Sequence, residues 1–245
     1  MSLRGSGATM LRVLMQLRRD PRTIVLIVGV PCLLETLLKE IFSGRPQVFQ
    51  HVGGPLLGLF PFVSMFVVTS VTMLRERVNG TLERLMSMPI GKLDLLGGYA
   101  GAFALVAVLQ ATVVSLLAFG VLDLHVAGPR WGVVALAVGN AVLGMSLGLF
   151  VSAFARTEFQ AVQFLPAVVL PQLLLSGLFV ARSDMAHWLQ IVSDALPLTY
   201  AYEALAKIVR GGPYSGRFAL DVGVTIGATI VALGLGAATL RRRTD

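Results

Sequence analysis

Long apolar blocks alternate with short polar connections along the chain. Six such blocks, most of them about 18 to 25 residues long, lie at 23–41, 56–74, 95–122, 131–154, 161–180 and 218–240. An α-helix rises about 1.5 Å per residue, so about 20 apolar residues cross the ~30 Å hydrocarbon core of a bilayer. A transmembrane β-barrel would show ~10-residue segments of alternating polarity, which we do not find. The pattern predicts one all-α domain over 1–245 with six transmembrane helices.

Composition indicates that lipid surrounds much of this chain. Hydrophobic residues make up 56% of the 245 residues and charged residues only 13%, whereas a soluble domain carries about 25% charged residues. The net charge is +7, and the basic residues lie between the apolar blocks. This distribution disfavours a nucleic-acid-binding face. The single Cys32 excludes a disulfide within the chain and a cysteine-based metal site. We find no His, Cys, Asp and Glu spacing typical of a metal site.

The distribution of Lys and Arg predicts which side the termini occupy. Cytoplasmic connections retain positive charge, and an even number of spans places both termini on one side. The termini's side would hold 13 basic residues and the other side seven, namely Lys39, Arg45, Arg130, Arg182, Lys207, Arg210 and Arg217. Both termini are therefore expected in the cytoplasm.

The region before the first block has the pattern of an amphipathic helix. Arg12, Gln16 and Arg19 recur at i, i+4 and i+7. The opposite face is apolar and consists of Met10, Val13, Leu14 and Leu17. We predict an interfacial helix on the cytoplasmic surface within 1–22, ending near Pro21. A plain basic start to the first span is the alternative.

The connection at 75–94 carries the most informative run of the chain. It reads Arg75-Glu76-Arg77-Val78-Asn79-Gly80-Thr81-Leu82-Glu83-Arg84-Leu85-Met86-Ser87-Met88-Pro89. Thr81 suits the N-cap of a short helix, Glu83 favours its positive end, and Pro89 ends it. Such an amphipathic helix is suited to docking on a soluble partner. An ordinary positively charged loop is the alternative.

The segment 181–217 is too polar to span a bilayer and too apolar for a free loop. Apolar residues recur at i, i+3, i+4 and i+7 from Met185 to Val192, and a second helical stretch runs over 199–209. The glycines and proline at 211–213 then break the chain. We predict short helices that pack at the outer membrane face or enter the membrane partway.

A serine-hydrolase motif is also present but has the wrong context. Gly144-Met145-Ser146-Leu147-Gly148 matches G-x-S-x-G, yet that motif needs a strained turn after a strand and a nearby base. Here it lies inside an apolar block. The spacing of Gly144 and Gly148 is better explained by close helix packing, and the same holds for the pairs Gly97/Gly101 and Gly223/Gly227.

Polar residues inside apolar blocks are candidates for a substrate path. Glu35 is the main candidate, although Lys39 follows at i+4 and a helical ion pair is the favoured interpretation. The other path candidates are Gln110, Asn140 and Gln172, for which hydrogen bonding between helices is an equal alternative. Pro166 and Pro171 are expected to kink the fifth span.

The arrangement of these features resembles the permease subunit of type-2 ABC exporters, in particular the bacterial drug-resistance type. Two local runs carry the resemblance. The first is similar to the family's coupling segment, which docks on the ATPase, and comprises Arg75, Glu76, Arg77, Gly80, Thr81, Leu82, Glu83, Arg84 and Leu85. The second is similar to its outer re-entrant helices and comprises Leu175-Ser176-Gly177, Trp188-Leu189, Pro197-Leu198-Thr199-Tyr200 and Glu203-Ala204.

The resemblance implies a homodimer or heterodimer of such bundles in the bacterial cytoplasmic membrane, with cytoplasmic ABC ATPase subunits as partners. The chain lacks G-x-x-x-x-G-K-[ST], so ATP and Mg²⁺ are expected on the ATPase, and this chain itself is expected to bind no cofactor and to catalyse no reaction. The implied function is export of a hydrophobic or amphipathic substrate, such as a drug, a lipid or a lipid-linked glycan, by alternating access. An intramembrane enzyme and a secondary transporter are the alternatives.

Overall fold

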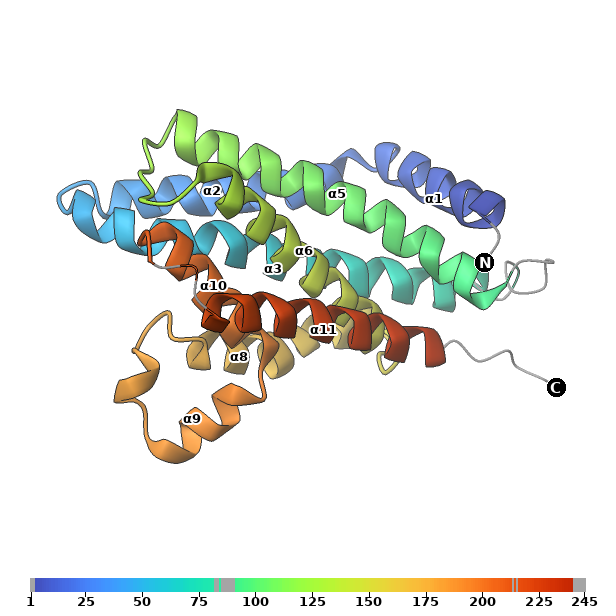
Figure 1. Cartoon of the computed structure of the whole chain (residues 1–245). Coiled ribbons are helices and arrows are strands. Elements are labelled where there is room, and N and C mark those ends of the chain that lie inside the picture. Colours follow the sequence, from blue (N-terminus) through green and yellow to red (C-terminus); the bar gives the residue numbers. More distant parts are fainter. Residues whose placement is uncertain (1–2, 82–83, 85–90, 213, 215, 240–245) are drawn as a thin grey trace.

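The computed structural model describes residues 3–81, 84, 91–212, 214 and 216–239, and these contain helices and no strand (Figure 1). The order is α1 (Leu3–Arg18), α2 (Pro21–Ile41), α3 (Pro46–Val78), α5 (Lys92–Gly120), α6 (Arg130–Val151), α7 (Glu158–Phe164), the π-helix η1 (Leu165–Val169), α8 (Leu170–Leu175), the 3-10 helix η2 (Arg182–Asp184), α9 (His187–Asp194), α10 (Pro197–Val209) and α11 (Gly216–Ala238). The predicted all-α class is confirmed over these residues.

Five helices in the described part of the chain are long and apolar enough to cross a membrane. They are Pro46–Val78, Asp94–Gly120, Arg130–Val151, Glu158–Leu175 and Gly216–Ala238. α2 covers the first predicted block but is not among them, and its 21 residues include the charged residues Arg22, Glu35, Lys39 and Glu40. The structure thus supports a membrane bundle with five such helices, whereas the sequence predicts six.

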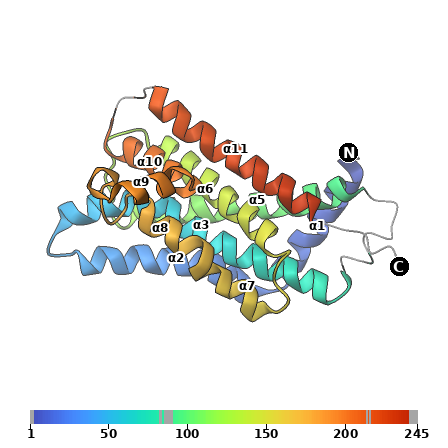
Figure 2. The ribbon, with the colours of Figure 1, turned by 90° about the horizontal axis from the view of Figure 1, so that it is seen from below.

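The bundle has two distinct ends. α1 begins and α11 finishes at one end, which we call the terminal end, and α9 and α10 lie towards the opposite end, which we call the far end (Figures 1 and 2). α3 begins at Pro46, well before the predicted start at 56, because Arg45 and Pro46 form a helix start with proline at the first turn. Within the predicted segment 181–217, the structure has the short helices η2, α9 and α10. Their location at the outer membrane face stays a prediction.

The fifth predicted span changes helical type where its prolines lie. α7 gives way to η1, which contains Pro166, and α8 contains Pro171 and ends at Leu175. Proline lacks a backbone N–H, so the regular ladder of α-helical hydrogen bonds is interrupted there. Gly177, with φ of +98°, then turns the chain.

α3 and α6 pack at the centre of the bundle through glycine. A Cβ atom at Gly144 would overlap the carbonyl oxygen of Phe62, and one at Gly148 would press on that of Phe66. The predicted close packing at this glycine pair is confirmed. Gly223 and Gly227 of α11 instead have nothing within 4 Å of an added Cβ, so the packing predicted there is wrong within the described chain.

Candidate coupling site

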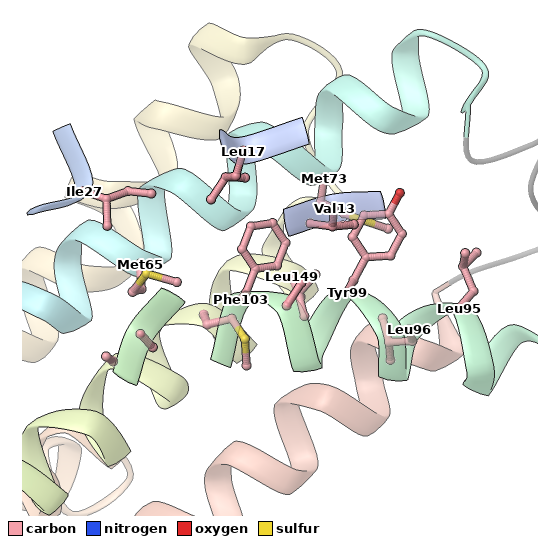
Figure 3. Close-up of a cluster of buried hydrophobic side chains, with 14 residues drawn as sticks. Val13, Leu17, Ile27, Met65, Met73, Leu95, Leu96, Tyr99, Phe103 and Leu149 are labelled. Atoms are coloured by element: carbon pink, nitrogen blue, oxygen red, sulfur yellow. The ribbon is translucent and has the colours of Figure 1, made fainter. Parts of the chain in front are cut away.

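α1 packs its apolar face against the start of α5. Val13 and Leu17 are buried in a cluster with Tyr99 and Phe103 of α5, to which Met73 of α3 also belongs (Figure 3). Gly98 permits close approach, because a Cβ atom there would overlap Thr9. The amphipathic helix predicted within 1–22 therefore forms, and it ends at Arg18. Asp20 then caps α2 through hydrogen bonds from Thr23, which lower the pKa of Asp20.

Arg12 connects three helices at the terminal end. One guanidinium nitrogen, Nη2, donates to the hydroxyl of Tyr99 on α5. The other, Nη1, lies 3.4 Å from Oε1 of Glu76 on α3. The sequence places Arg12 on one polar stripe with Gln16 and Arg19, but only those two are exposed. Arg12 points inwards because a buried acceptor lies on α3.

Glu76 is buried at this junction, with 4% of its side chain exposed. Its Oε1 faces Arg12, but its Oε2 has no hydrogen-bond partner among the described residues, and neither has Nε of Arg12. A buried carboxylate that is only half satisfied carries a desolvation penalty. The Arg12–Glu76–Tyr99 cluster is therefore a junction whose geometry is sensitive to small shifts of α1 or α3.

Arg75, one residue earlier, joins α3 to the fifth predicted span. Its Nε and Nη2 lie 2.7 and 2.9 Å from Oε1 and Oε2 of Glu158 at the start of α7. This is the two-point geometry that suits guanidinium and carboxylate, although both side chains are about half exposed. Neighbouring charges of the predicted coupling run thus face different helices, and Nε of Arg77 is buried without a described partner.

The coupling run itself is described only in part. α3 ends at Val78, and Gly80 has φ of +68°, a conformation that glycine adopts without strain. The amide of Arg84 donates to the carbonyl of Gly80, which makes one helical turn that includes Thr81. Leu82, Glu83, Leu85 and Pro89 lie outside the described residues, so the docking helix predicted there stays a prediction.

Glu35 is not paired with Lys39, which corrects the favoured interpretation. Glu35 is 0% exposed, and neither carboxylate oxygen has a partner among the described residues. Lys39 instead donates to the carbonyl of Leu122 at 2.7 Å and lies over the ring of Phe49. A cation close to the carbonyl end of α5 is favourable because the last carbonyls of a helix lack partners within it.

The other path candidates face different helices. Gln110 donates to the carbonyl of Ile27 on α2 at 2.7 Å, and Gln172 donates to Val168 in its own helical segment at 3.0 Å. The amide nitrogen of Asn140 lies beside Gly58 of α3 and has no described hydrogen-bond partner. These contacts do not bring the candidates together at one point. Ser146 donates to Val142 of its own helix, as a packing residue does.

The sequence interpretation missed an ionic network at the far end. Arg182 contacts Asp194 of α9 and Glu203 of α10, and Arg217 of α11 lies 3.5 Å from Glu203. Asp221 of α11 is 0% exposed and lies 2.5 Å from Nζ of Lys207 and 3.4 Å from Nε of Arg217. Only the i, i+4 spacing of Arg217 and Asp221 gives a local signal in the sequence. Tyr99 was missed as well, since a tyrosine within an apolar block carries no charge pattern.

Comparison with known proteins identifies relatives of this chain. A family model described as ABC-2 type transporter matches residues 7–209. The Escherichia coli (strain K12) protein named Probable multidrug ABC transporter permease YbhR is 32% identical over 178 residues, which cover 71% of this chain and 47% of YbhR. ABC transporter G family member 20 of Dictyostelium discoideum is 30% identical over 180 residues, which cover 73% of this chain and 25% of that protein.

A third relative is named for resistance to linearmycin. Linearmycin resistance permease protein LnrN of Bacillus subtilis (strain 168) is 25% identical over 148 residues, which cover 58% of this chain and 36% of LnrN. This chain thus spans less than half the length of each of these relatives. The family model nevertheless covers most of the chain, including α1, the end of α3 and the Arg12–Glu76–Tyr99 cluster. The chain therefore belongs to the ABC-2 type transporter family, and five helices in its described part are long and apolar enough to cross a membrane.

Proposed function

We propose that the chain is the permease subunit of an ATP-driven exporter in the bacterial cytoplasmic membrane. It crosses the membrane six times, with α2 as the first span and both termini in the cytoplasm. Its substrate is hydrophobic or amphipathic. Family membership and relatives named as multidrug and resistance permeases support this proposal. Energy comes from a separate ABC ATPase subunit, which holds ATP and Mg²⁺.

The Arg12–Glu76–Tyr99 cluster is the observation that carries the proposal. It joins the N-terminal helix, the last turn of α3 and the first turns of α5. The predicted coupling connection at 75–94 runs from the last turn of α3 to the start of α5. A partner that moves this connection therefore also displaces the cluster. ATP drives transport only if each nucleotide state binds the two permease conformations with different affinity. The cluster is suited to convert that difference into movement of α1 against α3.

The proposed assembly contains two permease chains and two ATPase subunits. The best 18-residue windows of 158–175 and 216–238 are each only 17% buried within the chain. Lipid or a second permease copy accounts for apolar surface of this extent. Glu35, Gln110, Asn140 and Gln172 stay proposed path residues, because each has a buried polar atom without a described partner and so can bind a substrate group when the helices separate.

Co-purification with an ABC ATPase encoded beside the gene tests this function. We expect Glu83→Ala to reduce ATPase pull-down and substrate-stimulated ATP hydrolysis, because Glu83 lies in the predicted docking helix. Glu40→Ala, an exposed charge at the far end, is the matched control and should change neither. Unchanged pull-down and transport in the Glu83 variant would count against coupling through this run. Loss of activity in Ser146→Ala with normal ATPase binding would instead favour an intramembrane enzyme.

A further inference from the structure

A pocket opens at the far end of the bundle, and its lining includes Arg182, Glu203 and Lys207 of the ionic network. Its volume is about 220 Å³, and its walls are one face of α10 and the turn that follows α8. Gly177 brings the two walls together, since a Cβ atom there would lie 3.2 Å from the ring of Tyr202. Three cationic side chains, Arg182, Lys207 and Arg210, line this pocket together with the single carboxylate Glu203.

The charges in the pocket are not balanced. Glu203 and Asp194 accept from Arg182, and Asp221 accepts from Lys207. Arg210 has no carboxylate within ion-pair distance among the described residues, and its one recorded side-chain contact is with Nε2 of His51 at 3.3 Å. The pocket therefore retains an unmatched positive charge at Arg210.

A hydrogen-bond donor accompanies this charge. The hydroxyl of Tyr202 makes no hydrogen bond with any described residue, although the residue is 6% exposed and lines the pocket. Burial raises the pKa of Tyr202, while the nearby charge of Arg210 lowers it and that of Glu203 raises it. The hydroxyl stays protonated at neutral pH and can donate to an acceptor in the pocket.

The surroundings of the pocket are amphipathic. Phe179 and Val180, in the turn after α8, are exposed, and so are Trp188 and Ile191 of α9. Exposed aromatic and aliphatic side chains beside charged groups are typical of the membrane–water boundary. Phe179 and Val180 follow Gly177 of the pocket wall closely in the sequence, so apolar surface is available near the pocket.

We propose that this pocket binds the oxyanion group, phosphate or carboxylate, of an amphipathic molecule in the membrane boundary. The guanidinium of Arg210 and the hydroxyl of Tyr202 donate to the oxyanion, and Lys207 adds positive charge. A planar guanidinium presents two parallel donors to such a group. The apolar part of the ligand lies along the exposed surface near Phe179. The pocket is a binding site within the permease chain and does not depend on the ATPase.

Binding to the purified full-length chain in a neutral maltoside detergent tests the proposal. Dioctanoyl phosphatidylglycerol is titrated by calorimetry, and dioctanoylglycerol, which has the same chains without phosphate, is the matched lipid. We expect saturable binding of the phosphatidylglycerol and at least about tenfold weaker binding of dioctanoylglycerol, because one charge-assisted contact contributes about 1.5–3 kcal/mol. Inorganic phosphate should compete.

Variants assign the binding to the pocket. Arg210→Gln should weaken binding at least about tenfold, and Tyr202→Phe about fivefold, since it removes one neutral donor. Arg45→Gln removes an exposed charge at the same end of the bundle and should leave the affinity unchanged. Arg210→Lys keeps the positive charge but lacks the two parallel donors of the guanidinium. Its affinity should lie between those of the wild type and Arg210→Gln. If Arg210→Gln does not elute as a folded species, Tyr202→Phe and Arg210→Lys decide the matter.

Two results would overturn the proposal, and one would refine it. Equal affinity of the wild type and the Arg210 and Tyr202 variants excludes this pocket, as does an equal loss in Arg45→Gln, which would show that only net charge matters. Saturable binding of phosphate but not of the lipid, lost in Arg210→Gln, supports the oxyanion site and assigns it to a soluble anion. Because no ATPase is present, none of these results depends on the proposed coupling function.

Discussion

The ionic clusters at the two ends of the bundle differ in the number of ion pairs and in the helices that they join. At the terminal end, a single arginine serves Glu76 and Tyr99, and buried polar atoms of both Glu76 and Arg12 stay without a described partner. At the far end, Arg182, Lys207 and Arg217 face Asp194, Glu203 and Asp221 in several ion pairs. Nε of Arg182 and Oδ1 of Asp221 also have no hydrogen-bond partner among the described residues. Several ion pairs thus join α10 to α11 at the far end, whereas at the terminal end one arginine connects α1 to both α3 and α5.

The largest effect on stability is expected from a substitution at the far end. Lys207→Met leaves Asp221 without its closer partner inside the bundle, and only Arg217 at 3.4 Å remains. Breaking a buried ion pair costs about 3–5 kcal/mol, and we expect about 3 kcal/mol here because Lys207 is partly exposed. Unfolding in increasing denaturing detergent, followed by circular dichroism, measures the loss. The double variant Lys207→Met with Asp221→Asn should recover most of it, and the absence of any recovery would contradict a pairwise role.

Arg12→Met tests the junction and should have a smaller effect on stability. Removing the guanidinium leaves a buried carboxylate unpaired, which costs about 1–3 kcal/mol, since Glu76 already has one unsatisfied oxygen. Substrate-stimulated ATP hydrolysis by the complex should fall more than stability does. Arg19→Met, an exposed charge just after the end of α1, is the matched control and should affect neither measurement. Normal stimulation in Arg12→Met would refute the junction's role in coupling.

Tyr99→Phe separates the hydroxyl from the ring. The ring is fully buried in the cluster of α1 and α5, so packing is kept, and the lost hydrogen bond to Arg12 costs about 1 kcal/mol. We expect a modest fall in the unfolding midpoint and a partial loss of stimulated ATP hydrolysis. Tyr214→Phe at the far end, where the ring is exposed, provides the comparison. A variant that matches Tyr214→Phe in both measurements would show that the hydroxyl does not contribute.

The smallest effect is expected at the exposed pair Arg75–Glu158. An exposed ion pair contributes about 0–1 kcal/mol and is screened by salt. Glu158→Gln should therefore change stability by less than about 1 kcal/mol, and the change should shrink between low and high ionic strength. A larger change in stability that persists in high salt would show that this pair contributes as much as a buried ion pair.

The sequence predicted the features that depend on local periodicity. The apolar stripe of Met10, Val13, Leu14 and Leu17 predicted α1, and the spacing of Gly144 and Gly148 predicted the packing of α6 on α3. Both patterns follow from 3.6 residues per turn. The length of the apolar blocks likewise predicted the five helices suited to cross a membrane, whereas α2, over the first block, is not among them.

The features that were missed depend on contacts between distant segments. Arg12 and Tyr99 are 87 residues apart, and hydropathy does not show which polar residue turns inwards. The i, i+4 rule favoured Glu35 with Lys39, but the carbonyl of Leu122 provides an acceptor for Lys39 at the end of α5. In the far-end network, Lys207–Asp221 and Arg217–Glu203 join α10 to α11, and no periodic pattern relates residues of two different helices.

The glycine contact between α6 and α3 has a mechanical consequence. At Gly144 and Gly148, no side chain separates the backbone of α6 from the carbonyls of Phe62 and Phe66. Interleaved side chains can change rotamer and so let two helices slide past one another. A contact between two backbones has no side chain that could adjust in this way. We therefore expect α3 and α6 to move as one rigid body, so that a displacement of α3 near Glu76 moves both helices together.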